Sequence, residues 1–205
     1  MNYTQAKKQV IILHPCHFIR QGIWSLLPSV CRVFDTADLE QSKRWLLTHG
    51  QTDLVIISLP GVNYSMLSVI DLIDELGQTN CRVLVMLDTL QSKGLQHYLA
   101  GSGEQVKVIA WDSPLPLLTR QIEQMVQGEV LPLQQTVTDF SQAYPERLSV
   151  LEFEVLETLL AGKTPRQLAN QLALREKEVS YYKCRALAKL GIKNIHSLLP
   201  GFPLL

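Results

Sequence analysis

The stretch from 148 to 199 carries the signals that most constrain how this chain folds. Ser149 followed by Glu152, and Thr164 followed by Gln167, both fit the capping-box pattern. In that pattern the hydroxyl accepts a hydrogen bond from an unpaired helix N–H, and the second side chain accepts one from the backbone of the capping residue. Each pair therefore predicts the first turn of a helix.

Further signals divide the same stretch into four helices. Pro165 stands at a first helical position, where its missing N–H costs nothing. Gly162 and Gly191 stand where a left-handed residue ends the preceding helix, and Asn194 is a suitable cap for a short last helix. The expected order is helix, tight turn, helix, short turn, longer helix and short helix.

The front of the chain alternates short apolar runs with helical patterns. The runs expected as strands are Gln9–Leu13, Val30–Phe34, Asp53–Ser58, Arg82–Leu87 and Val106–Trp111. The patterns expected as helices are Phe18–Leu27, Leu39–Thr48, Met66–Leu76, Gln91–Ala100 and Leu117–Gln127. Apolar strands separated by helices of this length are typical of a parallel sheet covered on both faces. The predicted class is α/β, a flavodoxin-like (βα)5 domain followed by an all-α domain.

Length and charge support two domains. We predict a front domain at 1–130, a linker at 131–146 that lacks periodicity, and a helical tail at 147–205. Residues 1–146 hold ten Lys/Arg against fourteen Asp/Glu, whereas 147–205 hold nine against five. The net charge of the chain is zero because an acidic front domain offsets a basic tail. The basic tail favours an anionic partner.

Composition argues against several other classes. No apolar run approaches the ~20 residues of a membrane span, and residues 1–9 lack the apolar core of a signal peptide. The four cysteines are scattered without a CxxC pair: Cys16, Cys31, Cys81 and Cys184. Such spacing favours reduced thiols over a disulfide framework or a zinc finger. We therefore expect a cytoplasmic protein with no membrane partner.

The order of parts resembles a known family. A (βα)5 domain, a linker and a tail that reads LSxxExEVLxxLxxG and ends its third helix in Lys189-Leu190-Gly191 resemble the NarL/FixJ (LuxR-type) response regulators. The resemblance implies a receiver-like front domain and a four-helix LuxR-type helix-turn-helix domain. It also implies a transcription regulator that binds double-stranded DNA.

The residues that carry phosphorylation chemistry in that family are replaced here. The family has two acidic Mg²⁺ ligands after its first strand, a phosphoryl-accepting carboxylate at its third, a Ser/Thr at its fourth and a Lys at its fifth. The matching positions are His14, Pro15, Ser58, Leu87 and Trp111. Because Mg²⁺ needs hard oxygen ligands and phosphoryl transfer needs its charge neutralised, the resemblance implies a pseudo-receiver that works without phosphorylation or a cofactor.

Three other interpretations concern the same positions. His14, Cys16 and His17 suggest a metal cluster, but residues in one turn rarely converge on one ion without further ligands. Ser58 lacks the GxSxG context of a nucleophile, and no acid/base pair or phosphate loop indicates an enzyme. Trp111 with Leu87 either simply packs or fills the vacated pocket and fixes an active-like surface.

The third tail helix is expected to read DNA. Val179, Tyr182, Ala186 and Leu190 follow a helical spacing, with Leu187, and form its core face. By the resemblance, the base-reading positions are Ser180, Tyr181 and Cys184. The residues expected at phosphates are Lys177, Lys183 and Arg185, with Thr164 and Arg166 on the preceding turn. A helix of this kind fits the major groove.

The tail departs from the family in ways that predict weak DNA binding. Arg175 replaces the usual Ser or Thr cap of the third helix, and Glu176 and Glu178 in its first turn repel phosphates. Tyr182 replaces a frequent His, and Pro200 cuts short the last helix, through which family members often pair.

Taken together, the sequence predicts a DNA-binding transcriptional regulator that acts independently of phosphorylation and has no catalytic activity. It would dimerise through the pseudo-receiver, with itself or with a conventional NarL/FixJ partner. One alternative is a regulator that titrates such a partner without binding DNA. Another is a small-molecule sensor, with a ligand at the carboxyl ends of the strands.

Overall fold

The computed structural model describes residues 7–49, 51–59, 64–87, 93–128 and 146–199. The strands are β1 (Lys8–Leu13), β2 (Cys31–Thr36), β3 (Leu54–Leu59), β4 (Arg82–Leu87) and β5 (Val106–Ala110). The front helices are α1 (His17–Leu26), α2 (Leu39–His49), α3 (Met66–Gly77), α4 (Lys93–Ala100) and α5 (Leu115–Gln127). The tail contains α6 (Val150–Leu160), α7 (Pro165–Gln171), α8 (Glu176–Lys189) and a 3₁₀ helix, η1 (Ile195–Leu198).

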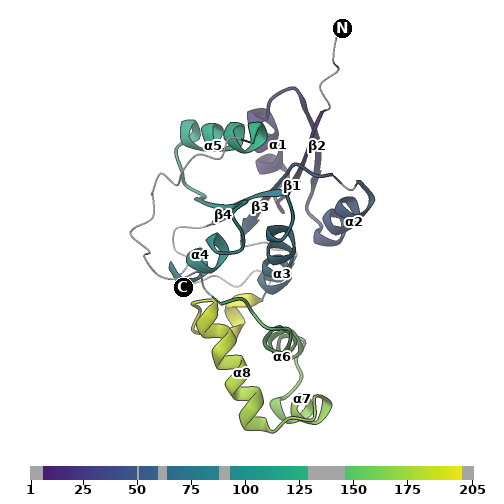
Figure 1. Ribbon diagram of the computed structural model, residues 1–205, viewed down its shortest axis with the longest axis vertical. Coiled ribbons are helices and arrows are strands. Elements are labelled where there is room, and N and C mark those ends of the chain that lie inside the picture. Colours follow the sequence, from purple (N-terminus) through teal and green to yellow (C-terminus); the bar gives the residue numbers. More distant parts are fainter. Residues whose placement is uncertain (1–6, 50, 60–63, 88–92, 129–145, 200–205) are drawn as a thin grey trace.

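The front domain is a parallel sheet with helices on both faces (Figure 1). Its strand order is β2-β1-β3-β4-β5, and every pairing is parallel, with Val10 opposite Leu54 and Leu54 opposite Arg82. This arrangement confirms the predicted flavodoxin-like class.

Successive residues of each strand face opposite cores, as the pleat requires. In β3, Val55 and Ile57 pack with α2, α3 and α4, whereas Leu54 and Ile56 pack with α1 and α5. Since the central strands are buried on both faces, they appear in the sequence as continuous apolar runs rather than alternating ones.

The predicted elements agree with the structure in type and order, and differ at their ends. Helix α5 begins at Leu115, two residues before the expected start, and proline is tolerated in a first turn. Helix α3 ends at Gly77, one residue after its expected end. Gln91 and most of the predicted linker lie outside the described residues.

Both predicted capping boxes are formed. Glu152 N–H donates to the Ser149 hydroxyl at 3.2 Å, and Ser149 N–H donates to the Glu152 carboxylate at 2.7 Å. The Thr164 and Gln167 pair repeats this geometry at 3.2 and 2.9 Å. These local hydrogen bonds are the reason that α6 and α7 begin where they do.

The helix ends are also close to expectation. Gly162 and Gly191 adopt positive φ angles of 89° and 63°. Asn194 accepts a hydrogen bond from His196 N–H at 3.0 Å, but the element that it caps is a 3₁₀ helix of four residues. Pro200 lies outside the described residues. Ala173, between α7 and α8, has a φ of 53°, which the sequence did not indicate.

The tail packs against the front domain through an apolar contact. One side of the tail has its own core, which includes Val155, Leu168 and Val179. The other side joins the core of α3 and α4 through Leu156, Ala186, Leu187, Leu190 and Leu198. In Figure 1 the carboxyl end of α8 meets the front domain, and its amino end extends away together with α7. None of the described helices has the length and apolar character needed to span a membrane.

Candidate functional site

The positions that match the family's phosphorylation site lie along one edge of the sheet. His14 and Pro15 follow β1, Ser58 is the penultimate residue of β3, Leu87 ends β4 and Trp111 follows β5. The carboxyl ends of parallel strands meet at one edge, so the fold gathers these residues where such sheets bind ligands.

Trp111 covers His14 at this edge. Their rings stack with centroids 5.5 Å apart and planes 18° from parallel. His14 is buried and Trp111 is 42% exposed, and the Trp111 N–H donates to the Leu87 carbonyl at 2.6 Å. The Leu87 side chain belongs to the core on the α3 and α4 side. Trp111 therefore forms a cover over His14 and contacts Leu87 by a backbone hydrogen bond.

Several polar groups at this edge have hydrogen-bond partners close by. His14 Nδ1 accepts from Cys16 N–H at 2.9 Å, and burial is the main cause that lowers the pKa of His14. Arg20 donates to the His14 carbonyl at 2.7 Å and pairs with Asp35 at 2.8 Å. The Tyr64 hydroxyl donates to the Ser58 carbonyl at 3.1 Å.

The described part of the chain contains no group of three or more His, Cys, Asp or Glu residues arranged to hold a metal ion. This covers the cluster of His14, Cys16 and His17 considered from the sequence.

Helix α8 presents a polar face. Lys177, Ser180, Tyr181 and Cys184 are all exposed, Tyr181 at 57%, and the Tyr181 ring meets Tyr182 edge-on with centroids 5.4 Å apart. The core face has Val179, Ala186, Leu187 and Leu190 buried and Tyr182 packed against the tail core. Thr164 and Arg166 are exposed at the start of α7.

Two of the residues expected to contact phosphates, Lys183 and Arg185, are not freely exposed cations. Lys183 is half-buried, because it follows Val179 by four residues and precedes Ala186 by three, on the packed side of α8. Arg185 is exposed along the helix but its guanidinium is occupied by carboxylates.

The amino end of α8 has half of a capping box. Arg175 has no side-chain acceptor, so it caps nothing itself. Glu178 accepts the Arg175 backbone N–H at 2.7 Å and pairs with its guanidinium at 3.2 Å. The backbone hydrogen bond is the main cause that lowers the pKa of Glu178. One acidic residue that was expected to repel phosphates therefore stabilises the helix start.

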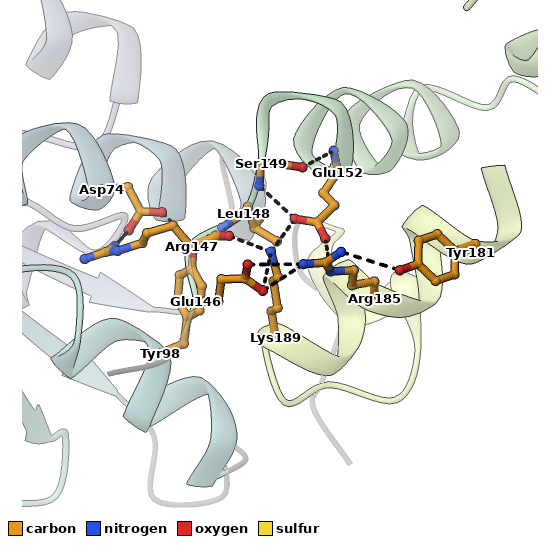
Figure 2. A network of polar contacts seen from close by, with 10 residues as sticks. All are labelled: Asp74, Tyr98, Glu146, Arg147, Leu148, Ser149, Glu152, Tyr181, Arg185 and Lys189. Carbon is orange, nitrogen blue, oxygen red and sulfur yellow. Dashed lines mark hydrogen bonds and ion pairs between the residues drawn. The ribbon is translucent and has the colours of Figure 1, made fainter. Parts of the chain in front are cut away.

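The carboxyl end of α8 carries a network of charges, which Figure 2 shows. Arg185 contacts Glu146 at 2.9 Å, Glu152 at 3.1 Å and the Tyr181 hydroxyl at 3.4 Å. Lys189 contacts Glu152 at 2.7 Å and Glu146 at 3.4 Å. Burial acts to raise the pKa of Glu152, but the hydrogen bonds from Lys189 and Ser149 outweigh it and the pKa is lowered.

Arg147 joins the tail to the front domain. Its guanidinium pairs with Asp74 of α3, donates to the Gly101 carbonyl at 2.6 Å and lies 5.7 Å from the centre of the Tyr98 ring. The Tyr98 hydroxyl donates to Asp74 at 2.6 Å, and Ser102 donates to it at 2.8 Å. Burial raises the pKa of Tyr98, which keeps this hydroxyl protonated.

Sequence reasoning missed this junction. Arg147 and Asp74 are 73 positions apart, and no periodicity links residues at such a separation. The one sequence signal was the pair Glu146-Arg147 directly before the first capping box, where opposite charges stand at the start of the tail.

Comparison of the sequence with known proteins gives a family match and a similar regulatory protein. Residues 146–199 match the family described as bacterial regulatory proteins, luxR family. The chain is 29% identical over 122 residues to the transcriptional regulatory protein DesR of Bacillus subtilis (strain 168), a match that covers 59% of each chain. The chain thus aligns with less than two thirds of the length of this relative.

Solved structures share the fold. A two-component response regulator RcsB–DNA complex is 17% identical, with a TM-score of 0.50 and coverage of 94% of this chain and 98% of that one. RcsB of Salmonella enterica serovar Typhimurium bound to promoter rprA is 18% identical, with a TM-score of 0.49 and the same coverage.

The luxR match lies on the helices that the capping boxes start, and the (βα)5 domain precedes it as in response regulators. Residues 146–199 thus form a domain of the luxR family of bacterial regulatory proteins, and the chain as a whole is similar to DesR in sequence and to a response regulator in fold.

Proposed function

We propose that this protein is a transcription regulator that binds double-stranded DNA through α8 and acts without phosphorylation. The observation that carries the proposal is the exposed face of α8, formed by Lys177, Ser180, Tyr181 and Cys184, within a tail that matches the luxR family. These residues occupy 177–184 of a helix that spans Glu176–Lys189, and the amino end of this helix extends away from the front domain (Figure 1). A helix placed so is free to enter a major groove.

The assigned roles follow from position and chemistry. Ser180, Tyr181 and Cys184 would meet base edges, and Lys177 would contact a phosphate at the start of the helix. Thr164 and Arg166 at the start of α7 would contact the adjacent DNA backbone. Since phosphate contacts do not read sequence, specificity would depend on α8.

Independence from phosphorylation is supported by the edge of the sheet. The positions where the family has acidic residues are occupied here by His14, Pro15 and Ser58. They therefore offer neither the Mg²⁺ ligands nor the phosphoryl acceptor that phosphorylation needs. Trp111 stacks over His14 at the same edge, which favours a fixed pseudo-receiver.

Dimerisation would use the face of the front domain that α1 and α5 cover. Large apolar side chains are exposed there, with Phe18 at 84%, Leu115 at 62% and Trp24 at 44%. On α5, Arg120 and Glu123 are exposed with opposite charges one turn apart. A two-fold axis across α5 would set each Arg120 opposite Glu123 of a second copy, so we propose a homodimer.

The DNA proposal is tested by selecting bound duplexes from a random-sequence pool with the full chain. Tyr181→Ala should change which sequences are enriched, whereas Lys177→Gln should weaken binding to all of them. Lys43→Gln, on α2, controls for loss of one positive charge. Unchanged binding and preference in both α8 variants would refute the assignment of this helix.

The dimer proposal is tested by the mass of the protein in solution. Light scattering should give a dimer for the native chain and a monomer for Leu115→Glu, which introduces charge at an exposed apolar position. A monomeric native chain that pairs only when mixed with a conventional family regulator would show a heterodimer instead.

A partner-titrating role is the second candidate. It is supported by the carboxylates of Glu146 and Glu152, which neutralise Arg185 and Lys189 of α8. If the full chain binds no duplex even at low salt, but removes a family regulator from its DNA, this role replaces the first.

A further inference from the structure

The guanidinium of Arg185 has an inner and an outer side. On the inner side, Nε contacts Glu152 at 3.1 Å, and this carboxylate is only 2% exposed. On the outer side, Nη2 contacts both oxygens of Glu146 at 3.1 and 2.9 Å, and the Glu146 side chain is 69% exposed. The same cation therefore has one fixed, buried partner and one that faces solvent (Figure 2).

Arg185 lies at the border of the exposed face of α8. It follows Tyr181 by four residues, and its Nη1 donates to the Tyr181 hydroxyl at 3.4 Å. Residues four apart are neighbours on a helix. A duplex in contact with Tyr181 would thus place phosphates within reach of the outer side of Arg185.

We propose that the Glu146 carboxylate occupies the place of a DNA phosphate on Arg185, so that the first residues of the tail restrain its affinity for DNA. The inference rests on the proposed DNA binding. Carboxylates and phosphates both bind guanidinium through oxygens with the same geometry and charge assistance, so one replaces the other without rearranging Arg185.

The surroundings allow this exchange. Glu152 is held by Ser149 N–H and Lys189, both at 2.7 Å, and so it keeps Arg185 oriented after Glu146 leaves. Lys189 retains Glu152 and the Arg147 carbonyl at 2.7 Å. Arg147 is anchored on Asp74 and Gly101. The exchange therefore requires only that an exposed side chain rotate, and exposed ion pairs are weak and screened by salt.

The experiment compares full-length variants on a short duplex of random sequence, between about 50 and 200 mM salt. Glu146→Gln keeps the shape of the side chain and removes its charge. Glu157→Gln, at an exposed position of α6, makes the same change of net charge and serves as the control. Arg185→Gln is made in the native chain and in the Glu146→Gln background.

The expected result is a gain confined to Glu146→Gln. At low salt it should bind on the order of 3–10-fold more tightly than the native chain, with a log–log salt slope steeper by about 0.9, because one further phosphate is neutralised. Arg185→Gln should cost little in the native chain and remove the whole gain in the Glu146→Gln background.

Three outcomes overturn the inference. If Glu146→Gln binds like the native chain, or gains no more than Glu157→Gln, the carboxylate is not a competitor, although DNA binding stands. If the gain persists with Arg185→Gln, it comes from net charge and not from this contact. Failure of every variant and the native chain to bind at any salt refutes the proposed function and the inference with it.

Discussion

The contact between Gly94 and Gly191 gives a sharp test of how the two domains meet. Gly94 is the second residue of α4, and Gly191 follows Leu190, the residue that caps the carboxyl end of α8. A Cβ at Gly94 would lie 2.6 Å from the Gly191 Cα, whereas ordinary contacts begin at 3.4 Å. The obstacle is backbone on both sides, so no side-chain rotation relieves it.

Replacing Gly94 with Ala should therefore push the tail from its place. Relief requires a shift of roughly 1 Å, and overpacking of this kind costs about 1–3 kcal/mol. Ala in a helix gains at most about 1 kcal/mol over Gly, so the net loss should be about 0–3 kcal/mol. Gly22→Ala is the matched control, because Gly22 lies in α1 with nothing within 4 Å of its Cβ.

The control should stabilise the protein by about 0.5–1 kcal/mol. Urea unfolding followed by circular dichroism gives both free energies, and limited proteolysis of the native state reports whether the tail has undocked. Equal stabilisation by Gly94→Ala and Gly22→Ala, with unchanged proteolysis, would refute the close approach of α4 and α8.

Three further outcomes are expected. Incubation with a small-molecule phosphodonor and Mg²⁺ should add no stable mass to the chain, and a phosphoryl group found by mass spectrometry within 1–128 would contradict the pseudo-receiver. Ala173→Gly should raise the free energy of unfolding by about 1 kcal/mol, because Ala173 adopts a φ of 53° that glycine tolerates better; an unchanged urea midpoint would argue against that strain. The pKa of Glu152 lies below its ordinary 4.5, so its contribution to stability is present above that pH and is lost as pH falls through the folded pKa. Urea midpoints measured downward from pH 7 should fall less steeply for Glu152→Gln, and parallel curves would contradict this.

The fold was predictable because its signals are local. A capping box joins residues three positions apart, such as Ser149 and Glu152, so the sequence alone indicates where α6 begins. Strand β3 is buried along its whole length, and a continuous apolar run is the pattern that two-sided burial produces. Type and order of elements followed from such signals, whereas 3₁₀ geometry at 195–198 and the left-handed Ala173 did not.

The exposed face of α8 was also predictable, since helical spacing separates Tyr181 and Cys184 from Val179 and Ala186. The same spacing placed Lys183 less well: it sits four residues after a buried position and is half-buried itself. Helical periodicity predicts which residues lie at the surface, but it does not predict which partner binds an exposed charged side chain.

By itself, the sequence determined the (βα)5 front, the four tail elements and the absence of carboxylates at the matching positions. Periodicity, caps and residue identity depend only on residues that are close together in the chain. Only the tertiary structure decided that Trp111 stacks on His14, that Arg147 binds Asp74 and that Glu146 occupies Arg185. These contacts join positions far apart in the chain. Their partners are selected by the path of the backbone and by shared burial, for which a linear pattern carries no signal.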